Sequence, residues 1–221
     1  MHALITGASG GLGEAVTQTF LDRGHGVTAV ARSWGEQTLA FFAVEADLTT
    51  ADGCKRAVAE AAALRPVDAL IHLMGGFAGG NPVQETDDAL WDRMMNLNLR
   101  SAFLMFRAAL PAMLAARHGR IVAVGSRTGT DPAAGLSAYG VSKAGLVALV
   151  RTLALELKGT GVTANVIMPS VIDTTANRRS MPGADTSRWV KPQSIASLIA
   201  YLVSDDARDV NGAVIPVYGG L

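Results

Sequence analysis

The stretch Thr6-Gly7-Ala8-Ser9-Gly10-Gly11-Leu12-Gly13 directly follows a short apolar run at residues 3–6 and opens a segment of helical periodicity at 12–23. Small residues between a strand and a helix let backbone N–H groups approach a phosphate closely, and the N-terminus of the helix adds partial positive charge. This turn therefore predicts a phosphate-binding loop within a fold that alternates strands and helices.

The same alternation continues along the rest of the chain. Six further runs are short, rich in Val, Ile, Leu and Ala, and bounded by Gly, Pro or polar residues, which is typical of buried strands; they lie at 27–31, 41–44, 69–73, 121–124, 163–168 and 213–217. Helices are expected at 51–64, 87–117, 139–158 and 192–203, and Pro111 should kink the 87–117 helix or restart it. Because parallel strands need crossover connections, this order predicts an α/β fold. We expect one Rossmann-type domain over residues 1–221, a doubly wound parallel sheet of about seven strands with helices on both faces.

The composition argues against several classes of protein. The 221 residues hold 19 Lys and Arg against 19 Asp and Glu, and this formal net charge of +0 disfavours binding to nucleic acid or to a membrane surface. Apolar runs are interrupted before the ~20 residues that a membrane helix needs, and no basic segment precedes a long apolar stretch at the start. The single cysteine, Cys54, fits a reducing compartment. No His or Cys spacing resembles a metal site, so we expect no metal. The interrupted apolar runs and the single cysteine lead us to expect a cytoplasmic protein.

Motifs along nearly the whole chain stand in an order that resembles the short-chain dehydrogenase/reductase family. They are the glycine-rich turn, Asp47-Leu48 after the third strand, Asn98 within Asn96-Leu97-Asn98-Leu99, Ser126 after the fifth strand, Tyr139-Gly-Val-Ser-Lys143, Pro169 after the sixth strand, and the end Asn211–Gly220. The resemblance implies an oxidoreductase that works with NAD(P)(H). It also implies catalytic roles: Tyr139 as acid/base, Lys143 as its electrostatic and ribose partner, Ser126 as the residue that orients the substrate, and Asn98 in a proton relay.

The spacing of the polar residues supports this chemistry independently. Tyr139 and Lys143 are four residues apart in a predicted helix, so both side chains lie on one face. A free tyrosine titrates near ~10, and a nearby ammonium group would lower that pKa towards the working range. Ser126 follows a strand at its carboxyl end, where its hydroxyl could stabilise charge developing on a substrate oxygen.

The end of the second strand bears on the choice of cofactor. An acidic residue there would bind the ribose hydroxyls of NAD, whereas the chain has Arg32, which favours the 2′-phosphate of NADP(H) over NAD(H). From the motifs and the resemblance together, the expected cofactor contacts are Gly7, Ser9, Gly11, Leu12, Gly13, Arg32, Asp47, Leu48, Gly75, Tyr139, Lys143, Pro169, Ile172 and Thr174.

The chain departs from the family pattern at several places. Leu73-Met74-Gly75-Gly76 stands where the family has Asn-Asn-Ala-Gly, and Pro169-Ser170 stands where it has Pro-Gly. The Gly-rich stretch around Phe77 and the residues from 172 to 189 resemble dihydropteridine reductase, a divergent branch that lacks the matching Ser and Asn. Reduction of a quinonoid pterin is therefore the alternative to a carbonyl or alcohol substrate. Phe77 and Trp189, together with Ser126, are candidate substrate contacts, and the 173–190 segment is expected to be a loop or short helices that could cover the substrate.

A third hypothesis is a regulator that senses NAD(P) without chemistry. The four intact candidate catalytic residues argue against it, because a pure sensor does not need them.

The 87–117 and 139–158 helices are apolar around much of their circumference, so each should bury one side on the sheet and the other on a partner. We therefore expect a homodimer or homotetramer that acts on a small molecule.

Overall fold

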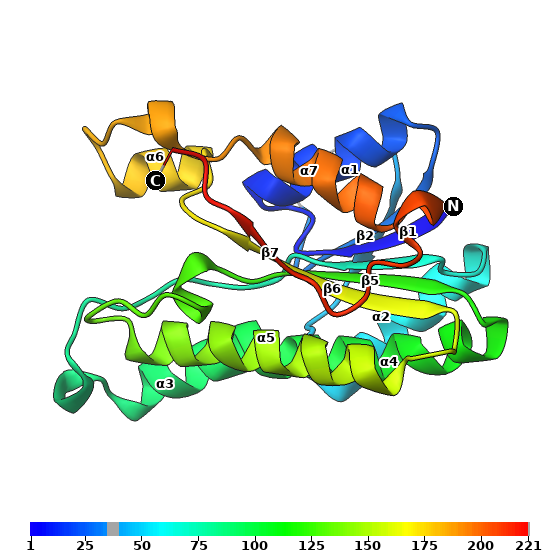
Figure 1. Cartoon of the computed structure of the whole chain (residues 1–221), viewed down its shortest axis with the longest axis horizontal. Helices are drawn as coiled ribbons and strands as arrows, with labels where there is room; N and C mark the ends of the chain where they lie inside the picture. Colours follow the sequence, from blue (N-terminus) through cyan, green and yellow to red (C-terminus); the bar gives the residue numbers. More distant parts are fainter. Residues whose placement is uncertain (35–39, 221) are drawn as a thin grey trace.

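The computed structural model describes residues 1–34 and 40–220, and it contains a seven-stranded sheet with helices on both faces (Figure 1). All neighbouring strands pair in parallel, in the order β3-β2-β1-β4-β5-β6-β7. The chain builds outward from β1 in one direction and then crosses to the other side of β1 to add β4 and the later strands. This reversal places the carboxyl ends of β1 and β4 side by side, which is where open α/β sheets bind ligands.

The seven strands predicted from the sequence are all present, with ends shifted by one or two residues. They are β1 (His2–Thr6), β2 (Gly26–Ala31), β3 (Phe42–Glu45), β4 (Ala69–His72), β5 (Gly119–Val124), β6 (Val162–Pro169) and β7 (Val214–Val217). Successive side chains point to opposite faces of the sheet. In β1, for example, Leu4 packs in one apolar core and Ile5 in the other.

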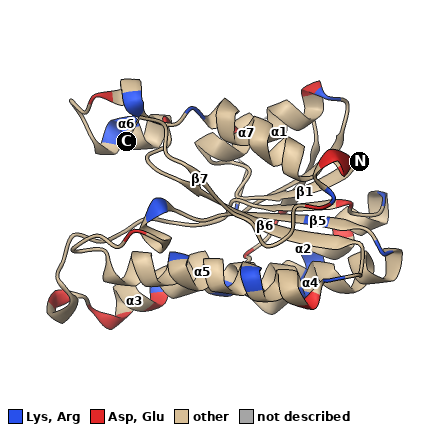
Figure 2. Ribbon diagram, viewed as in Figure 1, with Lys and Arg blue, Asp and Glu red and all other residues tan. Residues whose placement is uncertain are grey.

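Two layers of helices cover these cores, as the sequence predicts. Helices α1 (Gly11–Asp22) and α7 (Pro192–Leu202) pack together on one face, and α2 (Ala51–Leu64), α4 (Ser101–Ala116) and α5 (Ser137–Glu156) cover the other (Figure 1). Figure 2 shows charged residues mainly on helices and loops, with few on the strands between them. The observed architecture is therefore the expected doubly wound Rossmann-type sheet.

The predicted 87–117 helix is divided, although not at Pro111. Helix α3 (Asp88–Met95) is joined to α4 by a π-helical turn, η2 (Asn96–Arg100), and α4 then runs unbroken through Pro111. Proline cannot donate to the carbonyl of Arg107, but both residues are exposed, so water can bind that carbonyl. The expectation of a restart at Pro111 is therefore wrong, and the irregular turn lies instead around Asn98.

The 173–190 segment, expected to be a loop or short helices, contains two short helical turns. It contains α6 (Thr175–Ser180) and a 3-10 turn, η4 (Thr186–Arg188), and a parallel bridge between Ile172 and Val190 joins its ends. The segment leaves the sheet after β6 and projects beside the C-terminus (Figure 1). It is therefore a compact excursion at the carboxyl edge of the sheet.

Two helical stretches, Asp88–Ala116 and Ser137–Glu156, are long and apolar enough to cross a membrane by length and composition alone. Charged residues still interrupt both stretches, as expected from the sequence: Arg107 lies in the first and Lys143 in the second. Both stretches nevertheless pack on the sheet and contribute to its core. Core helices pass the same test, so these two are weak evidence for a membrane.

The start of the edge strand β7 depends on one buried amide. Asn165 Nδ2 donates to the carbonyl of Val210 at 2.8 Å, and Asn165 Oδ1 accepts from the N–H of Ala213 at 2.9 Å. Replacing Asn165 with Leu would leave both backbone groups without these partners. We expect Asn165→Leu to lower the free energy of unfolding by about 2–4 kcal/mol, measured by urea denaturation.

Asn81→Leu is the matched control for this substitution, because Asn81 is exposed. Its free energy of unfolding should change by no more than about 0.5 kcal/mol. Equal stabilities of the two variants would contradict the role given to Asn165.

Candidate functional site

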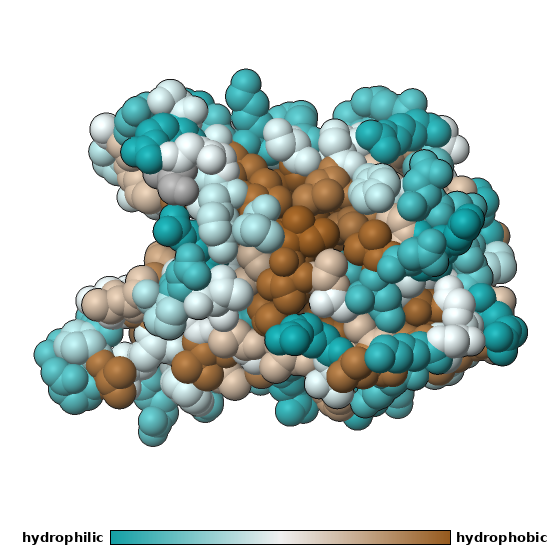
Figure 3. Space-filling view, in the orientation of Figure 1, coloured by the Kyte–Doolittle hydropathy of each residue, from teal (hydrophilic) through white to brown (hydrophobic). Residues whose placement is uncertain are grey.

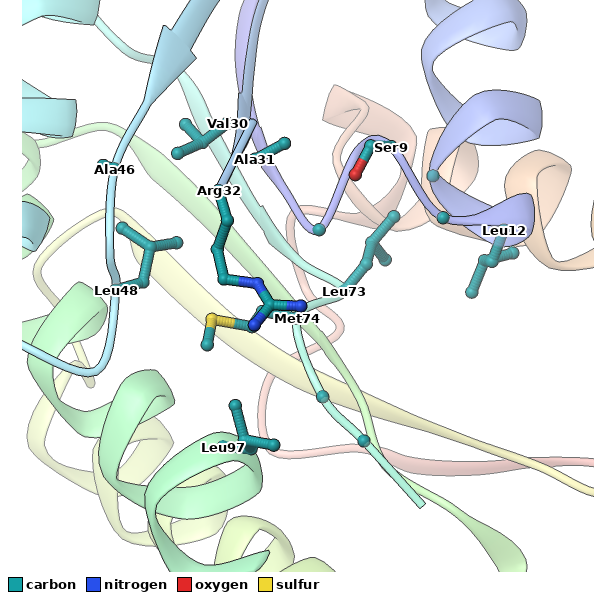
Figure 4. Close-up of a pocket in the computed structure, with 15 residues that line it drawn as sticks. Ser9, Leu12, Val30, Ala31, Arg32, Ala46, Leu48, Leu73, Met74 and Leu97 are labelled. Atoms are coloured by element: carbon teal, nitrogen blue, oxygen red, sulfur yellow. The ribbon is translucent and has the colours of Figure 1, made fainter. Parts of the chain in front are cut away.

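A cavity of about 440 Å³ lies at the reversal between β1 and β4. The residues around it come from the glycine-rich turn and from the ends of β2, β3 and β4, and the π-helical turn adds one more (Figure 4). The lining comprises Gly7, Ser9, Gly10, Leu12, Gly13, Val30, Ala31, Arg32, Ala46, Leu48, Leu73, Met74, Gly75, Gly76 and Leu97. The cavity thus combines an apolar interior with the backbone of a helix N-terminus, which suits an elongated ligand with phosphate groups.

The glycine-rich turn leaves no room for side chains at two of its positions. A Cβ on Gly7 would lie 2.8 Å from the backbone nitrogen of Met74, and Gly7 has a φ of +67°. A Cβ on Gly13 would lie 2.6 Å from the carbonyl carbon of Ala8. The turn is therefore packed backbone against backbone, and this packing keeps the N-terminus of α1 open towards the cavity.

The acidic and basic candidates near β2 and β3 behave differently. Arg32 extends from the end of β2 into the cavity (Figure 4). Leu48 also lines the cavity, but Asp47 does not. The carboxylate of Asp47 accepts hydrogen bonds from the N–H and hydroxyl of Thr49 at 2.9 and 2.7 Å, and these bonds lower its pKa. Contact between Asp47 and a cofactor stays a prediction.

The segment after β4 lies against Asn98, which is fully buried. Asn98 Oδ1 accepts from the N–H of Gly76 at 2.8 Å, and its Nδ2 donates to Ser142 Oγ at 3.0 Å. A Cβ on Gly75 would lie 2.8 Å from Asn98 Oδ1 and 3.2 Å from Lys143 Nζ. Gly75 therefore lets the cavity wall approach both predicted catalytic residues.

Ser126 and Tyr139 come together where β5 ends and α5 begins. Ser126 caps the 3-10 turn η3 (Arg127–Gly129), and its Oγ lies 2.9 Å from Thr128 Oγ1. Burial raises the pKa of Tyr139, whereas a hydrogen bond with the Ser126 side chain lowers it in part. The two hydroxyl groups therefore lie within hydrogen-bond reach of each other at the carboxyl end of β5.

Lys143 is buried on the same face of α5. Its Nζ donates to the carbonyl of Val124 at 3.1 Å and lies 6.0 Å from the centre of the Tyr139 ring. Burial lowers the pKa of Lys143 to about 8. The sequence led us to expect an ammonium that depresses the pKa of Tyr139, but in the structure burial dominates and raises that pKa. Desolvation disfavours the phenolate and the ammonium alike.

Of the three predicted contacts after β6, Thr174 lies against the glycine-rich turn. Pro169 ends β6, and Thr174 caps α6 by accepting from the N–H of Asn177 at 3.2 Å. A Cβ on Gly11 would lie 3.1 Å from the Thr174 side chain. Ile172 pairs with Val190, so it holds the end of the excursion rather than lining the cavity. Cofactor contacts from Pro169, Ile172 and Thr174 stay predictions.

Phe77 and Trp189, the two aromatic candidates for substrate contact, differ in exposure. Phe77 is 69% exposed and packs its ring edge-to-face on Tyr139, with the ring centres 4.9 Å apart. Trp189 is 7% exposed, directly after η4. Phe77 therefore stands beside a predicted catalytic group, whereas a substrate contact by Trp189 stays a prediction.

Several residues of the site were not predicted from the sequence. Met74 and Leu97 line the cavity, Ser142 joins Asn98 to the carbonyl of Tyr139, and Thr128 partners Ser126. Met74 stood in a stretch noted only for departing from the family pattern. Ser142 lay unremarked between Tyr139 and Lys143, and nothing in the local sequence signals the role of Leu97.

Neither a metal site nor a reactive cysteine is indicated among the described residues. They contain no group of three His, Cys, Asp or Glu side chains that could hold a metal ion. Burial raises the pKa of the Cys54 thiol to about 11, and its Sγ donates to the carbonyl of Leu48. Cys54 is therefore a packing residue rather than a nucleophile.

Comparison with known proteins agrees with this geometry. The profile of the short chain dehydrogenase family matches residues 1–184. The 3-oxoacyl-acyl-carrier-protein reductase MabA of Mycobacterium tuberculosis is 33% identical over 99% of this chain and 91% of its own length. The corresponding FabG reductase of Escherichia coli is 31% identical over 99% and 96%.

Solved structures show the same similarity. The aldohexose dehydrogenase of Thermoplasma acidophilum superimposes with a TM-score of 0.91 at 26% identity, covering 100% of this chain and 93% of that one. An oxidoreductase of the short chain dehydrogenase/reductase family from Burkholderia thailandensis gives a TM-score of 0.88 at 33% identity, covering 100% and 92%.

The lowered pKa of Lys143 predicts how the free energy of unfolding changes with pH. Between pH ~8 and ~10.5 the unfolded chain still binds a proton at Lys143 that the folded protein has lost, so the free energy of unfolding gains a positive slope with pH. Relative to Lys143→Met, the wild type should gain up to roughly 3 kcal/mol across this range. Urea denaturation at a series of pH values checks this.

Lys158→Met serves as the control, since Lys158 is exposed. Its stability should run parallel to that of the wild type. A Lys143→Met curve that also runs parallel would show that the ammonium is not desolvated.

Proposed function

Because the chain belongs to the short-chain dehydrogenase/reductase family and is an enzyme of that family, we propose that it transfers hydride between NADP(H) and a small carbonyl or alcohol substrate. The observation that carries this proposal is the meeting of Ser126, Tyr139 and buried Lys143 beside the cavity at the glycine-rich turn. Residues 1–221 would form a single dinucleotide-binding domain. The intact set of Ser126, Tyr139 and Lys143 favours catalysis over the alternative of a regulator that senses the cofactor without chemistry.

The glycine-rich turn suits a dinucleotide because it presents backbone rather than side chains to the cavity. Gly7 and Gly13 keep the N-terminus of α1 open for a pyrophosphate, and Leu48 and Leu97 offer apolar surface for flat rings. When bound, the nicotinamide supplies hydride chemistry. The chain's own residues would orient the substrate and deliver the proton.

The proton steps follow from the arrangement of hydroxyl groups. Ser126 would donate a hydrogen bond to the substrate oxygen while Tyr139 gives that oxygen its proton during reduction. Burial favours the neutral phenol in the free protein, so Tyr139 is in the protonated form needed for this step. Lys143 would bind the cofactor ribose and stabilise the phenolate that remains.

Asn98 completes the proposed relay on the far side of Lys143. Its amide is held by Gly76 and Ser142, which fixes the π-helical turn close to the lysine. We propose that this turn carries the path by which Lys143 exchanges protons with solvent.

The proposed substrate is a small molecule that reaches Tyr139 past Phe77. The edge-to-face packing of Phe77 on Tyr139 offers an apolar surface at the reacting hydroxyl. The similarity to 3-oxoacyl-acyl-carrier-protein reductases places 3-oxoacyl thioesters first in an assay panel, followed by aldehydes and ketones. Quinonoid dihydropterin belongs in the same panel, because the Gly-rich stretch that carries Phe77 suggested that branch.

We also propose that the enzyme is a cytoplasmic homodimer or homotetramer. Exposed apolar side chains lie on α4 and α5, including Phe103 and Leu155 at 45% and 63% exposure. Figure 3 shows a second apolar area over the edge strand β7. Burial of such faces against other copies of the chain would remove them from water.

Tyr139→Phe tests the proposed chemistry. Without the hydroxyl, turnover of whichever panel substrate is active should fall by about 10²–10⁴-fold, because the proton donor is lost. Binding of NADPH, followed by its fluorescence, should change little. Tyr201→Phe on the exposed face of α7 is the matched control and should keep full activity. Full activity of Tyr139→Phe would overturn the mechanism.

Arg32→Ala tests the choice of cofactor. Loss of a charged contact to a 2′-phosphate should weaken NADPH binding about ten- to a hundredfold and leave NADH binding unchanged. Arg23→Ala, at the exposed end of α1, is the control with the same change in net charge. Equal losses for NADPH and NADH would assign Arg32 a role other than 2′-phosphate recognition.

A further inference from the structure

A continuous run of buried hydrogen bonds passes through His72, the last residue of β4. His72 has no exposed surface. Its Nδ1 lies 3.0 Å from Thr6 Oγ1 at the end of β1, and its Nε2 lies 3.4 Å from Ser101 Oγ at the start of α4. The ring of Phe106 closes this site edge-on, with ring centres 5.9 Å apart. None of these groups takes part in the proposed proton relay.

Only one assignment of donors and acceptors satisfies every hydrogen bond in this run. The Ser101 hydroxyl donates its only proton to the carbonyl of Leu97 at 2.7 Å. Its oxygen must therefore accept from His72 Nε2–H. In a neutral imidazole Nδ1 is then an acceptor, and it takes the hydroxyl proton of Thr6. Thr6 Oγ1 is left free to accept the backbone N–H of Met74, which lies 3.3 Å away.

The neutral state of His72 is consistent with its surroundings. Burial lowers the pKa of His72 to about 3, and the nearby charge of Lys143 lowers it as well. The ring therefore stays uncharged, with its proton on Nε2, across the physiological range.

Both ends of the run reach the dinucleotide cavity. Met74 belongs to the wall after β4, and Leu97 belongs to the π-helical turn, and both line the cavity. His72 thus joins two walls that come from segments more than twenty residues apart. Leucine or valine at this position could fill the space but could not join the walls.

We propose that His72 is a positioning residue that sets the spacing of the two cavity walls, and so the affinity for the dinucleotide, without touching the dinucleotide or the reacting atoms. The affinity part of this inference rests on the proposed function, whereas the spacing of the walls does not.

The first test is His72→Leu, which keeps the volume roughly constant and removes both hydrogen bonds. Thr6 would lose its acceptor, so its hydroxyl would no longer be held for Met74. We expect hydrogen–deuterium exchange at the Met74 amide to rise by about tenfold or more and NADPH binding to weaken by about tenfold.

His2→Leu is the matched control. His2 is 2% exposed and bonds Thr28 Oγ1 of the neighbouring strand at 2.9 Å and the carbonyl of Arg65 at 3.0 Å. It is therefore a second buried histidine with two hydrogen bonds, but it does not line the cavity. His2→Leu should lose stability while keeping both the Met74 exchange rate and the NADPH affinity of the wild type.

Ser101→Ala is a milder second variant in case His72→Leu does not fold. It removes the acceptor of His72 Nε2–H and should shift Met74 exchange and NADPH affinity in the same direction. Combining it with His72→Leu should add much less than the sum of the two single effects, because both act through one run of bonds.

The wild-type protein provides a test without substitution. In ¹⁵N NMR spectra His72 should show the Nε2–H tautomer, with no titration between pH ~5 and ~8. An Nδ1–H tautomer, or titration in that range, would overturn the inference.

The remaining outcomes separate this inference from the proposed function. If the wild type binds neither NADPH nor NADH, the proposed function fails. Hydrogen–deuterium exchange at the Met74 amide in His72→Leu then still tests whether His72 holds the two walls together. If the wild type binds NADPH and His72→Leu matches it in both affinity and exchange, the inference fails alone. Equal losses of affinity in His2→Leu and His72→Leu would also overturn it, because general destabilisation would then explain the effect.

Discussion

The close approach of Gly7 to the backbone of Met74 is the contact on which the rest of the site depends. It joins the turn after β1 to the segment after β4, at the point where the order of strands reverses. A side chain at Gly7 would push these two segments apart, because its Cβ would lie 2.8 Å from a backbone nitrogen. The cavity exists because two strand ends can meet here backbone to backbone, and the N-terminus of α1 opens into the same space.

The polar groups around this contact are held by burial and hydrogen bonds more than by charge pairs. Lys143 donates to a strand carbonyl, Asn98 links the cavity wall to α5, and His72 ties two strand ends to the π-helical turn. Burial lowers the pKa of Lys143 and raises that of Tyr139. A site built in this way has fixed geometry, and burial holds Tyr139 as the neutral phenol in the free enzyme.

Motifs with local geometry could be predicted from the sequence. The glycine-rich turn, the four-residue spacing of Tyr139 and Lys143, and all seven strands are found as expected, because each depends on neighbouring residues. The restart at Pro111 could not be judged from sequence, because water can replace the missing donor on an exposed helix face. The raised pKa of Tyr139 was also missed, since burial depends on what packs around the ring.

The sequence by itself determined the class of fold, the glycine-rich turn between β1 and α1, and the spacing of the predicted catalytic residues Tyr139 and Lys143, because periodicity and short spacings encode them directly. Only the tertiary structure decided that Asp47 turns to Thr49, that Phe77 stands on Tyr139, and that His72 joins Thr6 to Ser101. These contacts unite residues that lie far apart in the chain or choose among partners that are equally near. Their outcome depends on how the strands and helices pack, which no local pattern of residues specifies.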